Sequence, residues 1–173
     1  MISPDEVKHK AKIKEDENFA FRTFLKINAD PEELDEQFLK FHNELFADYD
    51  CSKCRNCCKM YRGTIPEEDV EKLAGKFQVS KEEFIERFLE YNQSEFSYLT
   101  KHCPCDFLGE DMECALGEYK PINCVNYPYT DQPDRWGSLL GIVESAGICP
   151  VVYEILERLK EEYSFKKKRR KGF

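Results

Sequence analysis

Hydrophobic residues in the first third of the chain recur at helical spacing. Leu34, Phe38, Phe41 and Leu45 follow one another at steps of four, three and four, after the start signal Asp30-Pro31-Glu32-Glu33. A period near 3.6 residues marks one face of a helix, which normally packs on the protein's own interior. The pattern predicts a helix from about Pro31 through Leu45, and packing on the core is favoured over a partner-binding arm.

Similar start signals predict further helices. Ser3-Pro4-Asp5-Glu6 and Thr64-Ile65-Pro66-Glu67 each place a proline and carboxylates in a first turn, and the second helix should end near Ala74-Gly75. Ser80-Lys81-Glu82-Glu83 is a capping box. The helix that it opens has an apolar face made of Phe84, Ile85, Phe88 and Leu89.

Two other segments complete the pattern. Residues 17–29 mix helix and strand periodicity, and helix is favoured because the segment has few β-branched residues. After Pro150, a closing helix is predicted from the stripe Val152, Ile155, Leu156, Leu159 and Tyr163. Residues 92–100 read as a loop with a short strand at 96–99.

The predicted fold class is mainly α with short irregular strands, in which a small cysteine-rich domain is organised by metal. Residues 1–47 are interpreted as an N-terminal helical extension. Residues 48–163 form the cysteine-cluster metal-binding domain with the closing C-terminal helix, and residues 164–173 form a basic disordered tail. Glycines and prolines between residues 103 and 150 break regular structure, so bound ligands are expected to hold that stretch in shape.

Composition narrows the setting of this domain. Of 173 residues, 41% are hydrophobic and 35% are charged, as in a soluble globular protein with a charged surface. No apolar stretch approaches the roughly 20 residues of a membrane span, and residues 1–6 do not resemble a signal peptide. A cytoplasmic location is therefore expected. Thiols stay reduced there, so nine cysteines favour metal binding over disulfides.

Four of these cysteines lie within eight residues, in the stretch Cys51-Ser-Lys-Cys54-Arg-Asn-Cys57-Cys58. Two-residue gaps let sulfurs turn toward one centre, as in structural zinc sites and iron–sulfur proteins. Side chains of adjacent residues usually diverge, so Cys57 and Cys58 are expected to serve two metals or two edges of one cluster. More than four ligands are therefore expected, and Cys105, Cys114, Cys124 and Cys149 are the candidates for the others.

The cysteine pattern resembles the CxxCxxCC family, which is described as zinc- or iron-chelating. The match covers roughly residues 51–150 and includes Cys105-x-Phe-Leu, Lys120-Pro121-x2-Cys124-x2-Tyr127-Pro128 and Cys149-Pro150. The resemblance implies a small bacterial cytosolic module with eight motif cysteines, and Cys103 is the one outside the motif. A larger relative, the flagellin lysine N-methylase, has a similar pattern and is thought to carry an iron–sulfur cluster. Lys120 departs from the arginine usual in the family.

Eight thiols divide into two four-cysteine sites, which could bind zinc. Alternatively, Cys51, Cys54, Cys57 and Cys149 could hold a [4Fe-4S] cluster, leaving Cys58, Cys105, Cys114 and Cys124 as a second site. Basic side chains could offset the thiolate charge, and plain surface charge is an equal alternative for them. They are Lys53, Arg55, Lys59 and Arg62.

Two features outside the cysteines were weighed for function. His102, with Asp106 nearby, could be a ligand or proton carrier, but a structural role is favoured, and His9 and His42 are expected to be solvated or capping. The run Lys166 to Lys171 makes the remaining chain more acidic than the net charge of −8 indicates. This basic tail could dock on nucleic acid or an anionic membrane, but a solvated end is favoured.

The leading function is a cytosolic metal-binding protein whose metal is structural or handled rather than catalytic. The alternative is an iron–sulfur-dependent protein-modifying enzyme, similar to the lysine N-methylase, or a redox enzyme. A methylase needs a site for its methyl donor, and none is recognised in the sequence. The metal ion is the partner that the sequence predicts, and no protein partner is predicted.

Overall fold

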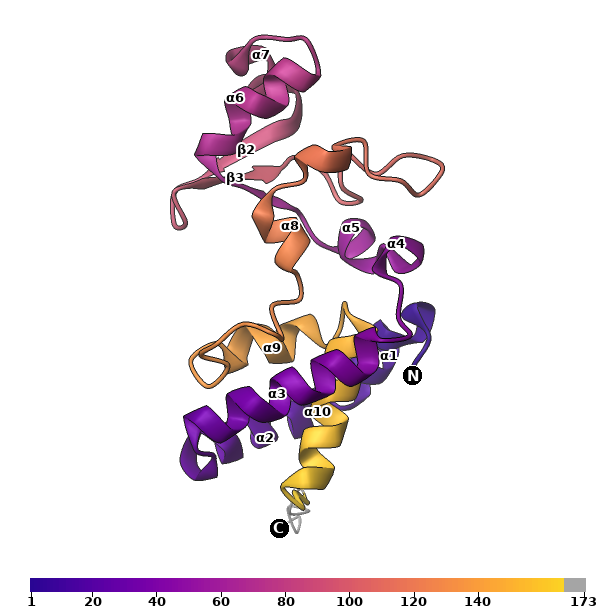
Figure 1. The fold of residues 1–173 in the computed structure, drawn as a ribbon, viewed down its shortest axis with the longest axis vertical. Coiled ribbons are helices and arrows are strands. Elements are labelled where there is room, and N and C mark those ends of the chain that lie inside the picture. The colour runs from indigo at the N-terminus through magenta and orange to yellow at the C-terminus, as the bar shows by residue number, and fades with distance from the viewer. Residues whose placement is uncertain (167–173) are drawn as a thin grey trace, which may run out of the picture. The chain divides into compact units, whose positions relative to one another are not determined.

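A computed structural model describes residues 1–166 and divides the chain into two compact units. Unit 1 consists of residues 1–50 and the segment that follows residue 127, and unit 2 consists of residues 51–127. Helices make up 57% of the structure, and the strands form one small antiparallel sheet. These features confirm the mainly α fold class with short strands. Figure 1 labels helices of both units and two of the strands.

Unit 1 is helical throughout its regular structure. The predicted stripe of α3 is buried at all four positions, and Asp30 caps the helix by accepting the backbone N–H groups of Glu32 and Glu33 at 3.0 Å. These contacts confirm the predicted start and face of this helix. The helices of unit 1 are α1 (Pro4–Ile13), α2 (Glu15–Asn28), α3 (Pro31–Phe46), α9 (Leu139–Ser145) and α10 (Pro150–Glu162).

The mixed periodicity of residues 17–29 belongs to helix α2. Phe21 and Leu25 are fully buried, whereas the side chains of Phe19 and Ile27 are exposed to solvent. Because apolar residues also lie on the exposed face of α2, the sequence does not show a clear helical spacing of apolar residues. At the start of α1, Ser3 occupies the N-cap position and Pro4 the first turn, but the Ser3 side chain makes no capping hydrogen bond.

A buried ion-pair network ties α2 to α10. The Lys160 ammonium is almost inaccessible to solvent, and it lies 2.7 Å from a carboxylate oxygen of Glu17 and 2.7 Å from one of Glu157. Lys14, between α1 and α2, also pairs with Glu157. Since a buried charge is tolerated only with partners, this network fixes the closing helix against the N-terminal helices. The predicted closing helix is thus confirmed as α10.

Unit 2 combines short helices with the sheet. The sheet has the order β1-β3-β2, and both pairings are antiparallel. The middle strand, β3 (Ser97–Thr100), confirms the predicted strand near residues 96–99. The elements of unit 2 are α4 (Cys51–Cys54), α5 (Asn56–Met60), β1 (Thr64–Ile65), α6 (Glu67–Lys76), α7 (Lys81–Phe88), β2 (Leu89–Asn92), β3, the 3-10 helix η1 (Gly117–Tyr119) and α8 (Ile122–Asn126).

The strands β1 and β2 were not predicted, because each is short and pairs with residues that are not adjacent to it in the sequence. β1 contains only Thr64 and Ile65, which pair with Leu99 and Tyr98 of β3. Leu89, expected on the apolar face of a helix, is the first residue of β2 and pairs with Thr100. Ser80 does cap α7 by accepting the backbone N–H of Glu83 at 3.1 Å.

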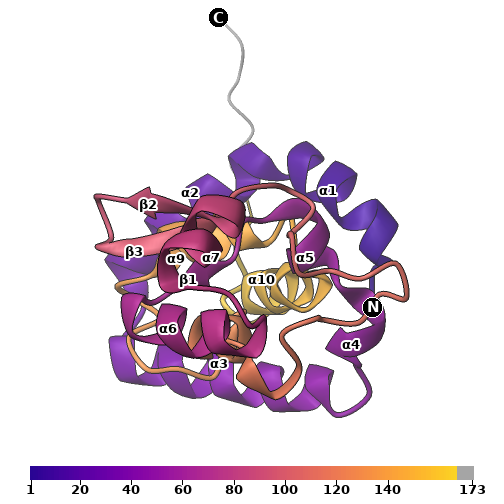
Figure 2. The same cartoon turned by 90° about the horizontal axis from the view of Figure 1, so that it is seen from above.

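Four phenylalanine rings form the centre of unit 2. Every pair among them has a centroid separation between 5.2 and 5.9 Å. They are Phe77, Phe84, Phe88 and Phe107. Three come from the α6–α7 region, which lies beside β2 and β3 in Figures 1 and 2. Phe107 comes from the cysteine-bearing loop, so this aromatic cluster anchors that loop to the rest of unit 2.

The structure does not test some of the predictions made from the sequence. The proposed bounds at residues 47 and 163 stay predictions, and most of the predicted basic tail, residues 167–173, lies outside the described residues. Within residues 1–166, no single helix is long and apolar enough to cross a membrane. The pair α9 and α10, bent by 119°, meets those criteria by length and composition only.

Substitution within α3 tests its packing. Leu34→Ala removes a fully buried side chain, whereas Leu39→Ala removes one that is 45% exposed on the same helix. We expect Leu34→Ala to lower the free energy of unfolding by about 2–5 kcal/mol, and Leu39→Ala by less than about 1 kcal/mol. Urea unfolding followed by circular dichroism measures both. Equal losses would contradict the assigned helix face.

Candidate metal centre

The first cysteine stretch folds as two short helices separated by Arg55. Arg55 has the left-handed backbone conformation, with φ 51°, and it ends α4 before α5 begins. In an unbroken helix, cysteines three apart would form one stripe. The break at Arg55 instead lets Cys51 and Cys54 lie on one short helix and Cys57 and Cys58 on the next.

The sulfur atoms of Cys57 and Cys58 lie 3.9 Å apart. The expected divergence of these adjacent side chains is therefore wrong for this pair. In a tetrahedral site with Zn–S bonds of about 2.3 Å, two sulfurs are separated by about 3.8 Å. Adjacent cysteines can thus present their sulfurs to one ion here, and their adjacency alone does not require two metals.

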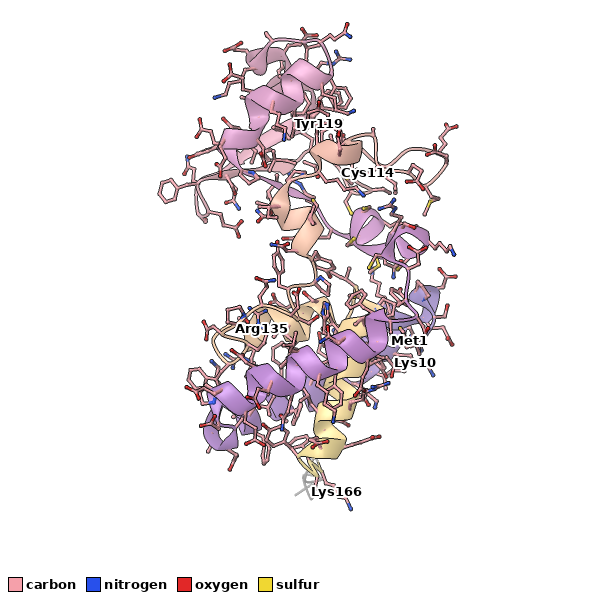
Figure 3. All side chains as sticks on the ribbon, in the orientation of Figure 1. Met1, Lys10, Cys114, Tyr119, Arg135 and Lys166 are labelled. Atoms are coloured by element: carbon pink, nitrogen blue, oxygen red, sulfur yellow. The ribbon has the colours of Figure 1, made fainter. Side chains whose placement is uncertain are left out.

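A backbone hairpin brings Cys105 and Cys114 into the same region. Leu108 and Cys114 form an antiparallel bridge, and the Ala115 N–H donates to the Phe107 carbonyl at 2.8 Å. The Cys105 N–H donates to the Cys58 carbonyl at 2.7 Å. The hairpin therefore joins the first cysteine stretch directly. In Figure 3, sulfur atoms gather near α4 and α5 and near the labelled Cys114.

Cys124 reaches this region from α8. Although the residue is exposed overall, its sulfur lies beside Gly63, where an added Cβ would be 3.5 Å from it. Gly63 precedes β1 and donates its N–H to the Thr100 hydroxyl of β3 at 3.1 Å. The sheet and α8 thus hold the Cys124 sulfur close to the strand that continues from the first cysteine stretch.

Four thiols of unit 2 act on one another electrostatically, and we call them the Cys58 set: Cys58, Cys105, Cys114 and Cys124. Burial raises the pKa of the Cys124 thiol to about 12, and the charges of the other three cysteines act in the same direction. Burial also raises the pKa of Cys105 to about 11, again with contributions from Cys58 and Cys114. These interactions link the four thiols, and the hydrogen bond from the Cys105 N–H to the Cys58 carbonyl ties two of their segments together.

The thiols of Cys57 and Cys58 differ in pKa. A hydrogen bond from the Cys57 thiol lowers the pKa of Cys58 to about 6, against the effect of burial. The same hydrogen bond and burial raise the pKa of Cys57, as does charge at Cys51. The strongest electrostatic partner of Cys57 is thus Cys58. On sequence spacing alone, we call the three cysteines separated by two-residue gaps, Cys51, Cys54 and Cys57, the Cys51 set.

Two cations lie next to the Cys58 set. Arg55 and Lys120 both lower the pKa of Cys58, and Lys120 also lowers that of Cys124. The Arg55 side chain is buried, and it donates from Nε to the Met112 carbonyl and from Nη2 to Glu113, each at 3.0 Å. It therefore clamps the hairpin of Cys114 to the first cysteine stretch. Sequence reasoning counted Arg55 among four candidates and did not assign Lys120 this role.

The other predicted residues lie elsewhere. Arg62 donates to the Thr100 carbonyl at 2.5 Å and to Glu90 at 2.6 Å. Cys149 is buried in unit 1, at the N-cap of α10. His42 bonds to the Thr130 hydroxyl at 2.8 Å, and burial lowers its pKa. His9 is exposed, as expected of a solvated residue.

The donor set suits a thiolate-bound metal, but its sulfurs would have to move closer together to hold one. Within residues 1–166, no three histidine, cysteine, aspartate or glutamate side chains are arranged to hold an ion as they stand. The Cys58 set must close inward to do so. Four thiolates around a divalent ion leave two negative charges, and Arg55 and Lys120 supply two positive ones beside them.

These features define a small, mainly helical, cysteine-rich protein of the metal-chelating class. Residues 50–150 match the CxxCxxCC family model, whose description is "Putative zinc- or iron-chelating domain". The chain belongs to this CxxCxxCC family, and the resemblance inferred from the cysteine spacing is confirmed. No curated protein and no solved structure matches the chain.

The hairpin provides a matched pair of cysteine variants. Cys105→Ser removes a member of the Cys58 set, whereas Cys103→Ser removes an exposed thiol outside that set. We expect Cys105→Ser to lose about one metal ion per chain, because a four-thiolate site needs all its ligands, while Cys103→Ser keeps full metal content. Elemental analysis distinguishes them, and equal losses would remove the distinction.

The Arg55 clamp can be tested against Arg62. Arg55→Gln removes a charge beside Cys58 and the contacts to the Cys114 hairpin, whereas Arg62→Gln removes contacts to Thr100 and Glu90. We expect Arg55→Gln to weaken metal binding by about 10–100-fold, the range seen when groups supporting metal ligands are removed. Chelator competition measures the affinity. A similar weakening in Arg62→Gln would show a general charge effect.

Proposed function

We propose that this protein is a cytoplasmic metal-binding module in which the Cys58 set holds one zinc or iron ion through four thiolates. The supporting observation is the mutual electrostatic interaction of these four thiols, which three separate segments bring together. Cysteine ligands in groups of four are typical of structural zinc sites. The bound ion would hold together the irregular loops of unit 2 and would have no open coordination position for a substrate.

Burial of thiols makes their ionisation in this region depend on a nearby cation. Cys105 and Cys124 must lose protons to become ligands, and burial opposes that loss. A divalent ion supplies the missing stabilisation of the thiolates. Arg55 and Lys120 would hold the remaining charge, so the local groups suit a closed, charge-balanced site.

The Cys51 set and Cys149 are further candidate ligands on their spacing alone. The gaps of two residues between Cys51, Cys54 and Cys57 are also those of iron–sulfur proteins. This spacing favours a second candidate function, an iron–sulfur redox or protein-modifying enzyme similar to the lysine N-methylase. Catalytic residues for such an activity are not assigned.

The cytoplasmic location is part of the proposal. It is supported by the use of cysteines as metal ligands, which need a compartment that keeps thiols reduced. In an oxidising compartment, close thiols such as Cys57 and Cys58, with sulfurs 3.9 Å apart, would be exposed to oxidation.

The metal content of the intact protein tests the proposal. Protein purified without oxygen, from cells supplied with both zinc and iron, should be colourless and contain one or two zinc ions per chain, as four-thiolate sites predict. Cys149→Ser, analysed in parallel, reports whether Cys149 contributes. Cys124→Ser should lose the ion of the Cys58 set.

The alternative results are equally specific. Brown protein that contains iron and acid-labile sulfide would favour the iron–sulfur enzyme over a mononuclear module. Protein that contains no bound metal, and binds none from added zinc or ferrous iron under reducing conditions, would contradict the proposed function.

A further inference from the structure

A histidine and a cysteine outside the motif lie on the surface, in the segment that leads into Cys105. His102 has a side chain that is 71% exposed, and its Nδ1 lies 2.5 Å from Asp106 Oδ1. The His102 backbone N–H also donates to Asp106 Oδ2 at 3.0 Å. Asp106, only 12% exposed at its side chain, therefore holds the histidine by two hydrogen bonds.

These bonds determine which ring nitrogen is available. A carboxylate accepts hydrogen bonds and does not donate them, so Nδ1 is the donor in this contact. In the tautomer that this contact selects, Nε2 is the ring nitrogen with the lone pair. This arrangement, in which a carboxylate orients a histidine for metal binding through its other nitrogen, is the usual support for histidine ligands.

Cys103 lies beside the same metal centre. Its sulfur donates to the Lys59 carbonyl at 3.2 Å, and Lys59 follows Cys58 directly. Two residues further on, the Cys105 N–H donates to the Cys58 carbonyl. The Cys103 thiol and the Cys105 backbone are therefore hydrogen-bonded to two consecutive carbonyls, those of Lys59 and Cys58.

We propose that His102 and Cys103 form a loading pair, which takes up a divalent zinc or ferrous ion from solution and passes it to the Cys58 set. This inference rests on the proposed function, since the pair delivers the ion that the Cys58 set holds. One imidazole nitrogen and one thiolate are suitable donors for these ions. Two protein ligands bind more weakly than four, so the pair passes the ion on and does not retain it.

The transfer is a ligand exchange without oxidation or reduction. The ion first binds Nε2 of His102 and the Cys103 thiolate, and water completes its coordination. The four thiols of the Cys58 set would then replace Cys103, His102 and the water ligands one by one, and each thiol that still carries a proton would release it to solvent as its bond to the ion forms. Cys103 would regain the proton that it lost on binding the ion, and His102 and the waters would be left free as before.

The loading pair can be tested on the metal-bound protein, without unfolding it. Zinc-loaded protein is mixed with an excess of a heavier stable zinc isotope, and the bound isotope ratio is followed by mass spectrometry. Release and uptake use the same route in reverse, so loss of the pair slows exchange. We expect His102→Gln, Cys103→Ala and Asp106→Asn to exchange about tenfold more slowly, the lower end of the effect of removing support for a metal ligand, with unchanged total zinc.

Matched controls separate the loading role from other causes. His9→Gln removes an exposed histidine in unit 1 and should exchange at the rate of the unchanged protein. His102→Gln and Asp106→Asn should be less than additive in combination, because Asp106 acts through His102. Cys103→Ser should resemble Cys103→Ala, because a hydroxyl does not replace the thiolate.

Each other outcome overturns the inference. Unchanged exchange rates in His102→Gln and Cys103→Ala show that ions reach the Cys58 set without the pair. A loss of total zinc in Cys103→Ala makes Cys103 a permanent ligand. If the unchanged protein binds no zinc at all, the proposed function fails, and the loading pair fails with it. If the unchanged protein binds zinc and the variants exchange zinc at the same rate as it does, the proposed function stands and the loading pair is contradicted.

Discussion

The burial of several thiols in one small region is the constraint on which unit 2 depends. The thiol groups of Cys105 and Cys124 are largely surrounded by protein, although Cys124 as a residue is exposed, and their pKa values rise to about 11 and about 12. At neutral pH these cysteines stay protonated, unable to act as ligands, unless a positive charge stabilises the thiolate. The fold therefore brings together thiols whose ionisation depends on a cation, so the proposed metal binding would be linked to the shape of the cysteine-bearing loops.

Two anchors hold the loops in the right place before any ion binds. The rings of Phe77, Phe84, Phe88 and Phe107 pack together, so the Cys105 segment is attached to the core of unit 2. Arg55 attaches the Cys114 hairpin through Met112 and Glu113. A left-handed conformation costs a residue other than glycine roughly 1–2 kcal/mol, and the contacts of the Arg55 side chain offset that cost.

The sequence was most informative where the structure is local. The apolar stripe of α3, the Asp30 cap and the Ser80 cap depend on residues within a few positions of each other, and all were predictable. β1 and β2 depend on pairing with β3 across tens of residues, so no local pattern indicated them. The grouping of Cys58 with Cys105, Cys114 and Cys124 was one alternative from spacing, and the electrostatic interactions among these thiols support it. The 3.9 Å approach of Cys57 and Cys58 depends on rotamers that spacing cannot specify.

The position of Lys120 explains how a site can be closed and still charge-balanced. Arg55 is committed to the hairpin through Met112 and Glu113, so part of its charge is shared with a carboxylate. Lys120 acts on both Cys58 and Cys124, which come from segments far apart in the sequence. An ammonium on a flexible chain can follow the sulfurs as they close around an ion, whereas a clamped guanidinium cannot. In the proposed site, Arg55 would therefore position the loops, and Lys120 would balance the charge of the thiolates as they close around an ion.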